Sequence, residues 1–165
     1  MSQLLSKLNA ETELQWTKST PLYSGTNIIH ARVANIALIL TASHAHFDHC
    51  RPVRQTFANA VAFFGPGTSE YCSPGHFADL SSIWDGRFFD PKRATERWET
   101  LQGPWVPFGP FSHAMDFFGD GSFWICQAPG HMPGNLGACT RLASGAWVML
   151  GSDCCHTRYM LLDYF

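Results

Sequence analysis

Ser43-His44-Ala45-His46-Phe47-Asp48-His49 is the most informative stretch of this sequence, because it places four side chains that can bind a metal ion within six residues. Neutral imidazoles and carboxylates are ligands that zinc accepts. His44 and His46 are two residues apart, so an extended backbone directs both to the same side. Asp48 and His49 are adjacent, and the chain must turn before they can face a second metal ion. The stretch therefore predicts a metal site.

An apolar run at residues 36–41 directly precedes the histidines. Such a run is typical of a strand that is covered on both faces, so the ligands are expected on a loop at its carboxyl end. Residues 60–64 predict a second apolar strand, which Gly65-Pro66-Gly67 ends. Leucines spaced three to four apart predict a short amphipathic helix within residues 3–16, and residues 53–58 predict another short helix. Residues 71–109 contain many Gly and Pro turns and predict mostly loop.

The last third of the chain predicts two β-hairpins. Residues 114–118 and 123–127 flank a Gly-Asp-Gly-Ser turn, in which Asp120 is most simply a turn residue. Residues 136–142 and 146–150 flank a second turn. The loop between the hairpins presents His131, and the segment after the second hairpin presents Asp153. Each of these two side chains is therefore expected at the end of a strand.

The composition indicates one globular domain, residues 1–165, with 45% hydrophobic and 15% charged residues. The net charge of −2 and scattered basic residues favour neither nucleic acid nor an anionic membrane as a partner. No apolar stretch approaches the roughly 20 residues that cross a bilayer, and the N-terminus lacks the apolar core of a secretory signal. We therefore expect a cytoplasmic protein with reduced cysteines and a small-molecule substrate; the oligomeric state stays open.

Three segments together resemble the metallo-β-lactamase superfamily. Residues 43–49 match its HxHxDH signature, residues 129–134 resemble its later GHTPG loop, and Gly151-Ser152-Asp153 resembles the segment of its bridging carboxylate. The resemblance covers residues 36–156, and residues 117–131 are most similar to fungal members near the quorum-quenching lactonases. It implies an α/β fold, the superfamily's αβ/βα sandwich of two sheets between helices, in an incomplete form.

The resemblance also implies a dinuclear zinc site. His44, His46 and His131 would hold one zinc ion, Asp48 and His49 would hold a second, and Asp153 would bridge both. Asp48 would be catalytic, because it would orient the attacking water and later protonate the leaving group. The implied reaction is hydrolysis of a small cyclic ester or amide, a lactone or a lactam, in fungal secondary metabolism or xenobiotic detoxification.

The sequence departs from this family at both ends. Only 43 residues precede His44, and only 12 follow Asp153, with His156 as the sole histidine among them. The late metal-binding histidine of the family has no clear counterpart, and His156 is expected to play a structural role. These departures predict a chain truncated at both ends that could bind one zinc ion rather than two. The alternatives are a catalytically inactive relative, a thioesterase of the same superfamily and, with less support, an iron-dependent redox member.

Other residues with reactive or large side chains have simpler interpretations. Cys50 is expected to be a small buried apolar residue rather than a ligand or nucleophile. Cys154 and Cys155 lack a second pair at zinc-finger spacing, and His30, His76 and His113 are isolated. A set of aromatic side chains either lines an apolar pocket or packs the core: Phe77, Trp84, Phe88, Phe89, Trp98 and Trp105.

Overall fold

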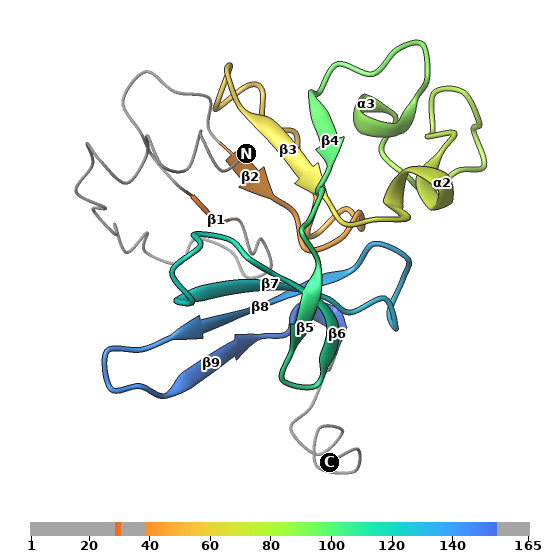
Figure 1. Ribbon diagram of the computed structural model, residues 1–165. Coiled ribbons are helices and arrows are strands. Elements are labelled where there is room, and N and C mark those ends of the chain that lie inside the picture. Colours follow the sequence, from red (N-terminus) through yellow and green to blue (C-terminus); the bar gives the residue numbers. More distant parts are fainter. Residues whose placement is uncertain (1–28, 31–38, 155–165) are drawn as a thin grey trace.

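The structure is a computed structural model that describes residues 29–30 and 39–154 (Figure 1). Within this part of the chain the strands form two sheets, one mixed and one antiparallel. The helix predicted within residues 3–16 and the histidine at position 156 lie outside the described residues.

The first sheet carries the strand that leads into the histidine motif. Its strand order is β1 (Ile29–His30), β2 (Ile39–Thr41), β3 (Val61–Phe64) and β4 (Trp98–Thr100). β1 pairs with β2 in the antiparallel sense, whereas β2, β3 and β4 are parallel. The predicted strands at residues 39–41 and 61–64 are thus confirmed. Residues 36–38 of the first prediction lie outside the described part.

Regular elements also occur where mostly loop was expected. α2 (Thr68–Cys72), α3 (Gly86–Phe89), β4 and β5 (Val106–Phe108) are three to five residues long. Elements this short have no detectable periodicity in the sequence. The N-terminal cap of α3, where the Asp85 carboxylate accepts a hydrogen bond from the Arg87 amide, was the only local signal for that helix. Most of residues 71–109 lie outside helices and strands, as predicted, and the exceptions are the end of α2, α3, β4 and β5.

The helix predicted at residues 53–58 is also wrong. A single turn forms there, in which the Phe57 amide donates to the Val53 carbonyl. The Val53 and Arg54 amides instead donate to the buried Glu96 carboxylate, each at 2.9 Å. Glu96 lies 42 residues after Arg54 in the chain. A local sequence pattern therefore could not show that its side chain pairs with these two backbone amides.

The second sheet is an antiparallel meander, and it contains both predicted hairpins. Its strands in order are β5, β6 (Phe111–Asp116), β7 (Phe123–Gln127), β8 (Leu136–Arg141) and β9 (Trp147–Leu150). β6 begins three residues before the predicted strand. The turn after it is closed by Asp116, whose carboxylate accepts from the amides of Gly119 and Gly121. The short 3-10 helix η1 (Ser152–Cys154) follows β9.

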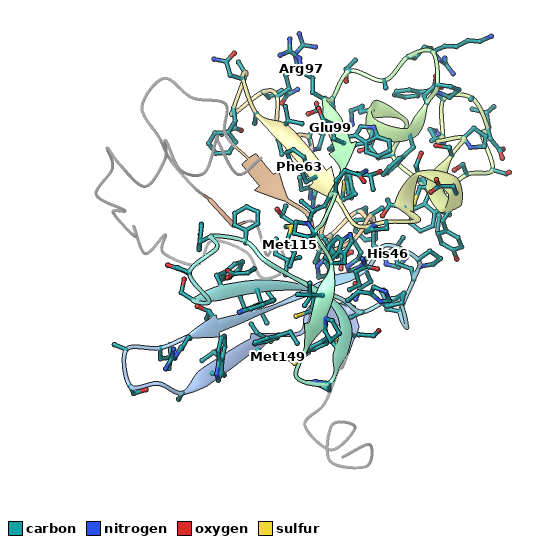
Figure 2. All side chains as sticks on the ribbon, viewed as in Figure 1. His46, Phe63, Arg97, Glu99, Met115 and Met149 are labelled. Carbon is teal, nitrogen blue, oxygen red and sulfur yellow. The ribbon has the colours of Figure 1, made fainter. Side chains whose placement is uncertain are left out.

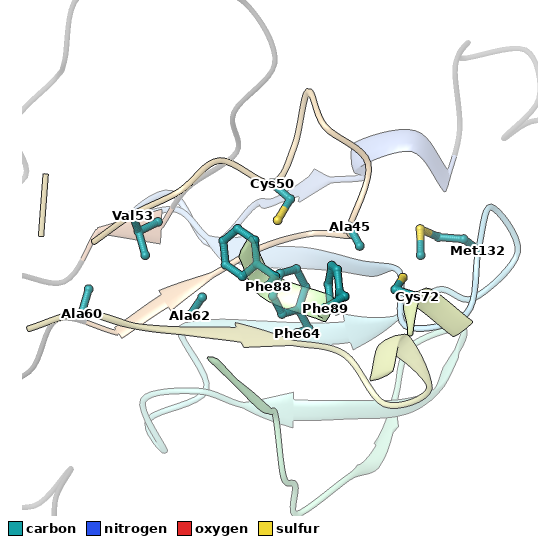
Figure 3. Packing of buried hydrophobic residues seen from close by; sticks show 10 residues of the cluster. All are labelled: Ala45, Cys50, Val53, Ala60, Ala62, Phe64, Cys72, Phe88, Phe89 and Met132. Carbon is teal, nitrogen blue, oxygen red and sulfur yellow. The ribbon is translucent and has the colours of Figure 1, made fainter. Parts of the chain in front are cut away.

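Two apolar clusters lie on the two faces of the first sheet. Ala62 and Phe64 of β3 join the cluster formed with α3, whereas Phe63 points the other way and packs between the sheets. Figure 3 shows that the first cluster also receives Ala45 from the histidine motif and Met132 from the β7–β8 loop. The core therefore anchors two of the segments that carry candidate metal ligands.

The fold is mixed, rich in sheet and poor in helix, and it fits a partial αβ/βα sandwich. α2 and α3 lie on the side of the first sheet (Figure 1). In the described part of the chain the short 3-10 helix η1 lies against β8 of the second sheet. The outer face of the second sheet carries aromatic side chains, with Phe108 and Trp124 stacked at 4.2 Å between ring centroids.

Candidate metal centre

The histidine motif forms a tight loop at the carboxyl end of β2. His44 is buried and Ala45 packs into the core, so alternate residues separate the ligand face from the core face. A turn follows, because the amides of His49 and Cys50 both donate to the His46 carbonyl. The loop is tied to the second sheet, since the Leu136 amide donates to the Ser43 carbonyl at 2.7 Å.

The β7–β8 loop presents His131 at the same place. Asn135 closes this loop, because its side-chain amide donates to the Ala128 carbonyl and its own carbonyl accepts from the Ala128 amide. Met132, next to His131, is inserted into the core of the first sheet. Gly134 has a φ of +79°, and a side chain there would collide with Thr68 of α2. Only glycine thus allows this close contact between loop and helix.

Asp153 meets the histidines from the end of β9. Its Oδ2 atom lies 3.6 Å from His44 Nε2, 3.4 Å from His49 Nε2 and 3.7 Å from His131 Nε2. Figure 2 shows His46 in the same region, between α2 and the second sheet. The three segments come from different sheets and loops, so their convergence is a property of the fold.

The six predicted ligands form two groups that share Asp153. One group contains His44, His46, His131 and Asp153, and the other contains Asp48, His49 and Asp153. In each group the possible ligand atoms lie within 4.8 Å of one another. Asp48 Oδ2 is 3.5 Å from His49 Nε2, and its side chain is 52% exposed. The structure therefore brings together all the residues that the sequence singled out as ligands.

The spacing of these atoms fits a bound metal ion. Two ligands that each lie 2.0–2.1 Å from a tetrahedral metal are separated by about 3.3 Å. His46 Nδ1 and His131 Nε2 are 3.0 Å apart, and the distances from Asp153 are slightly longer than 3.3 Å. The atoms therefore surround a point at which a metal ion could reach all of them.

His44 supplies a second indication of fit. Its Nε2 atom is buried and makes no hydrogen bond, which is costly for a polar atom unless some other group engages it. Burial, followed by the neighbouring His49 and His46, lowers the pKa of His44 to about 4. Burial and His131 also lower the pKa of His46. Both shifts favour the neutral ring, which is the state in which imidazole binds a metal.

Some contributors to the site were not assigned from the sequence. Trp84 stacks on the His46 ring with centroids 5.3 Å apart and an interplanar angle of 21°. The hydroxyls of Ser43 and Ser152 contact the buried sides of His44 and His49. Ser43 and Ser152 stand directly beside predicted ligands in the sequence, which was the available signal. Trp84 lies 38 residues from His46, and no local pattern connects the two.

The other candidates lie mostly in the core or at the surface. Cys50 is buried in the first cluster, and burial raises the pKa of its thiol, as expected for an apolar role. Phe88 and Phe89 pack the core, and Trp98 and Trp105 pack against the two clusters. His76 and His113 are exposed, and Phe77 lies against the guanidinium of Arg93. None of the described cysteines forms a disulfide, and His30 and Cys155 fall where no side chain is described.

Several fungal proteins are similar to this chain. The metallo-hydrolase mfmC of Annulohypoxylon moriforme is 31% identical over 93% of the chain and 41% of its own length. The γ-lactamase MBL2 of Gibberella moniliformis is 31% identical over 69% of the chain and 48% of its own length. The cytochrome P-450 monooxygenase mpaDE′ of Penicillium brevicompactum is 30% identical over 93% of the chain, but over only 18% of its own length.

The chain therefore spans less than half the length of each of these relatives. No family model matches the chain, and no solved structure matches it. None of the helices in the described part is long and apolar enough to cross a membrane. The expectation that the chain is truncated at both ends stays a prediction.

Proposed function

We propose that this chain, a relative of the fungal hydrolases of the metallo-β-lactamase superfamily, is a metal-dependent hydrolase that opens a small cyclic ester or amide. The observation that carries the proposal is the approach of three histidine Nε2 atoms to within 3.7 Å of one carboxylate oxygen of Asp153. The names of the metallo-hydrolase and γ-lactamase relatives support hydrolysis, and the second supports a lactam in particular.

His44, His46, His131 and Asp153 would hold one metal ion, and Asp48, His49 and Asp153 would hold the other. We propose zinc, because neutral imidazole and carboxylate donors suit it. Bound zinc would supply a Lewis acid for the substrate carbonyl and would lower the pKa of a water molecule in the site. The donor set fits this role, since burial keeps His44 neutral and the fold brings both groups onto Asp153.

Asp48 is the side chain that we propose moves the proton. Its carboxylate is half exposed at the mouth of the site, next to the buried His49 ring. It can accept a proton from the attacking water while the new C–O bond forms. It can then return that proton to the oxygen or nitrogen that leaves when the ring C–O or C–N bond breaks. The products are a free carboxylate and an alcohol or an amine on the same molecule.

The test compares purified protein treated with a chelator before and after Zn²⁺ is restored. A panel of aryl-fused γ-lactams, γ-lactones and thioesters is assayed for ring opening or thiol release. We expect lactone or lactam hydrolysis that disappears with the chelator, returns with Zn²⁺ and is absent in His46→Ala. His113→Ala, a histidine on the exposed side of β6, is the matched control and should keep full activity. Hydrolysis that survives in His46→Ala would refute the proposal, and thioester hydrolysis alone would change the substrate class.

A further inference from the structure

One hydroxyl group contacts a histidine from each of the two ligand groups. Ser43 Oγ lies 3.3 Å from His44 Nδ1 and 3.3 Å from His49 Nδ1. It also lies 2.9 Å from Ser152 Oγ, which in turn lies 3.4 Å from His44 Nδ1. Ser43 is buried, so these contacts are shielded from competing water.

We propose that Ser43 is a positioning residue that fixes the tautomers of His44 and His49 together, and so couples the two metal ions. The proposal rests on the metal centre proposed above. The Nε2 atoms of His44 and His49 face Asp153. For both atoms to offer a lone pair to metal, both rings must carry their hydrogen on Nδ1.

The hydrogen-bonding capacity of one serine matches this requirement. A hydroxyl oxygen accepts two hydrogen bonds and donates one. The Ser152 hydroxyl donates to Ser43 Oγ in the structure. Because both hydroxyl hydrogens rotate, this bond can reverse, so that Ser43 Oγ accepts from a hydrogen on each Nδ1 and donates its own hydrogen to Ser152 Oγ. Both acceptor sites and the one donor of the Ser43 hydroxyl are then used. Because the two rings share this oxygen, a change in the hydrogen bond from one ring affects the hydrogen bond from the other.

The backbone around Ser152 supports the same arrangement. Ser152 has a φ of +51°, and among the described residues all others with a positive φ are glycines. A side chain in that conformation is strained, and it persists where its surroundings fix it. Here it directs the Ser152 hydroxyl back to Ser43, across 109 residues of sequence. Ser43 also joins the two sheets through its carbonyl, which accepts from the Leu136 amide.

The first test is a calorimetric titration of chelator-treated protein with Zn²⁺. Ser43→Ala should weaken binding at both sites by about 10- to 100-fold, the usual effect of losing a partner that orients a ligand. Ser43→Thr should restore binding, because it keeps the hydroxyl. Ser152→Ala should have the smaller effect, since Ser152 reaches only Ser43 and His44.

Ser112→Ala is the matched control, because it removes a serine that lies 3.1 Å from His113 Nδ1 outside the site. Its Zn²⁺ binding should equal that of the wild type. Binding in Ser43→Ala that equals the wild type at both sites, or that weakens at one site only, would overturn the proposal. If the wild type itself binds no Zn²⁺, the proposed function fails; if it binds while Ser43→Ala binds equally well, only the role of Ser43 fails.

The second test reads the tautomers directly and does not depend on affinity. Long-range ¹H–¹⁵N spectra of the Zn²⁺-loaded protein with labelled histidine distinguish a ring protonated at Nδ1 from one protonated at Nε2. We expect His44 and His49 both to be protonated at Nδ1, with hydrogens that exchange slowly with water in the wild type and in Ser43→Thr. Fast exchange of both hydrogens in folded Ser43→Ala would support the proposal. A His49 ring protonated at Nε2 in the wild type would overturn it.

Discussion

His44 combines full burial, an unpartnered Nε2 atom and a place between the two sheets. In the metal-free protein this ring stays neutral at a pH at which it would be charged in the unfolded chain. Its folded pKa of about 4 is below the unfolded value of 6.5. The unfolded state therefore binds more protons between these values, and the stability of the fold must decrease as the pH falls through that window.

This difference gives a prediction for chelator-treated protein. The urea concentration at half-unfolding should be lower at pH 5 than at pH 7, because His44 takes up a proton on unfolding. The decrease in this urea concentration from pH 7 to pH 5 should be smaller in His44→Asn, which has no ring to protonate at this position. Equal midpoints at pH 5 and pH 7 in the wild type would show that His44 has an ordinary pKa.

Among single residues, the metal ligands could be predicted from the sequence, whereas the residues that position these ligands could not. The spacing of His44, His46, Asp48 and His49 is local and carries the chemistry of metal binding. The stacking of Trp84 on His46 and the contact between Ser152 and Ser43 join residues far apart in the chain. Such contacts depend on the folded backbone, and no local pattern connects their two ends.

Among the elements, the contact between α2 and the β7–β8 loop fixes the position of His131. A Cβ atom at Gly134 would collide with Thr68, and one at Gly65 would collide with the Gly134 carbonyl. Gly134→Ala should therefore separate loop and helix, lower the free energy of unfolding by well over 1 kcal/mol and weaken Zn²⁺ binding. Urea unfolding and calorimetry check the two effects.

Gly145→Ala is the control for this change. Gly145 has a similar φ of +86°, but a Cβ atom there would meet nothing within 4 Å. The free energy of unfolding of this variant should decrease by about 1 kcal/mol, because of the backbone conformation alone. The variant should bind Zn²⁺ like the wild type. Equal losses in the two variants would show that the close contact does not hold the loop.

Glu96 is a second support that acts between elements. Its carboxylate accepts from the Val53 and Arg54 amides, which follow the histidine loop. Glu96→Gln should cost about 1–3 kcal/mol, because both amides donate to the same carboxylate oxygen, Oε2, and a neutral amide oxygen accepts more weakly than a charged one. Glu99→Gln, at an exposed position of β4, should change the free energy of unfolding by less than about 0.5 kcal/mol. A thermal or urea denaturation series checks both, and equal stability of both variants would contradict the role of Glu96.

The elements differ in how well the sequence predicted them, for physical reasons. The two hairpins have turn glycines with positive φ, Gly119 and Gly121 in the first and Gly145 in the second, and both hairpins were predicted. α2, α3 and β4 are too short for a pattern, and β4 in addition depends on long-range pairing with β3. The turn at residues 53–57 was assigned to a helix because nothing nearby revealed its partner, Glu96.

In the molecule as a whole, the two-sheet architecture was implied by the resemblance of three ordered segments rather than by any periodicity. In the described part of the chain β9 is an edge strand, and all four of its residues are 38–45% exposed. An exposed apolar edge can pair with another chain.

We therefore predict that the purified chain associates as its concentration rises. Val148→Lys places a charge in the middle of β9 and should lower the average mass measured by sedimentation velocity toward that of the monomer. Leu142→Lys, in the turn before β9, removes an equally exposed apolar side chain without charging the strand and should associate like the wild type. A wild-type chain that stays monomeric at all concentrations would contradict the prediction.

The six convergent side chains should form one centre for two metal ions. The most direct measurement is the number of Zn²⁺ ions bound per chain after chelation, dialysis and reloading, with elemental analysis of wild type and His46→Ala. The geometry predicts two tightly bound ions in the wild type, and the loss of at least the ion held by His44, His46 and His131 in the variant. One ion or none in the folded wild type would contradict it, as would equal binding in His46→Ala.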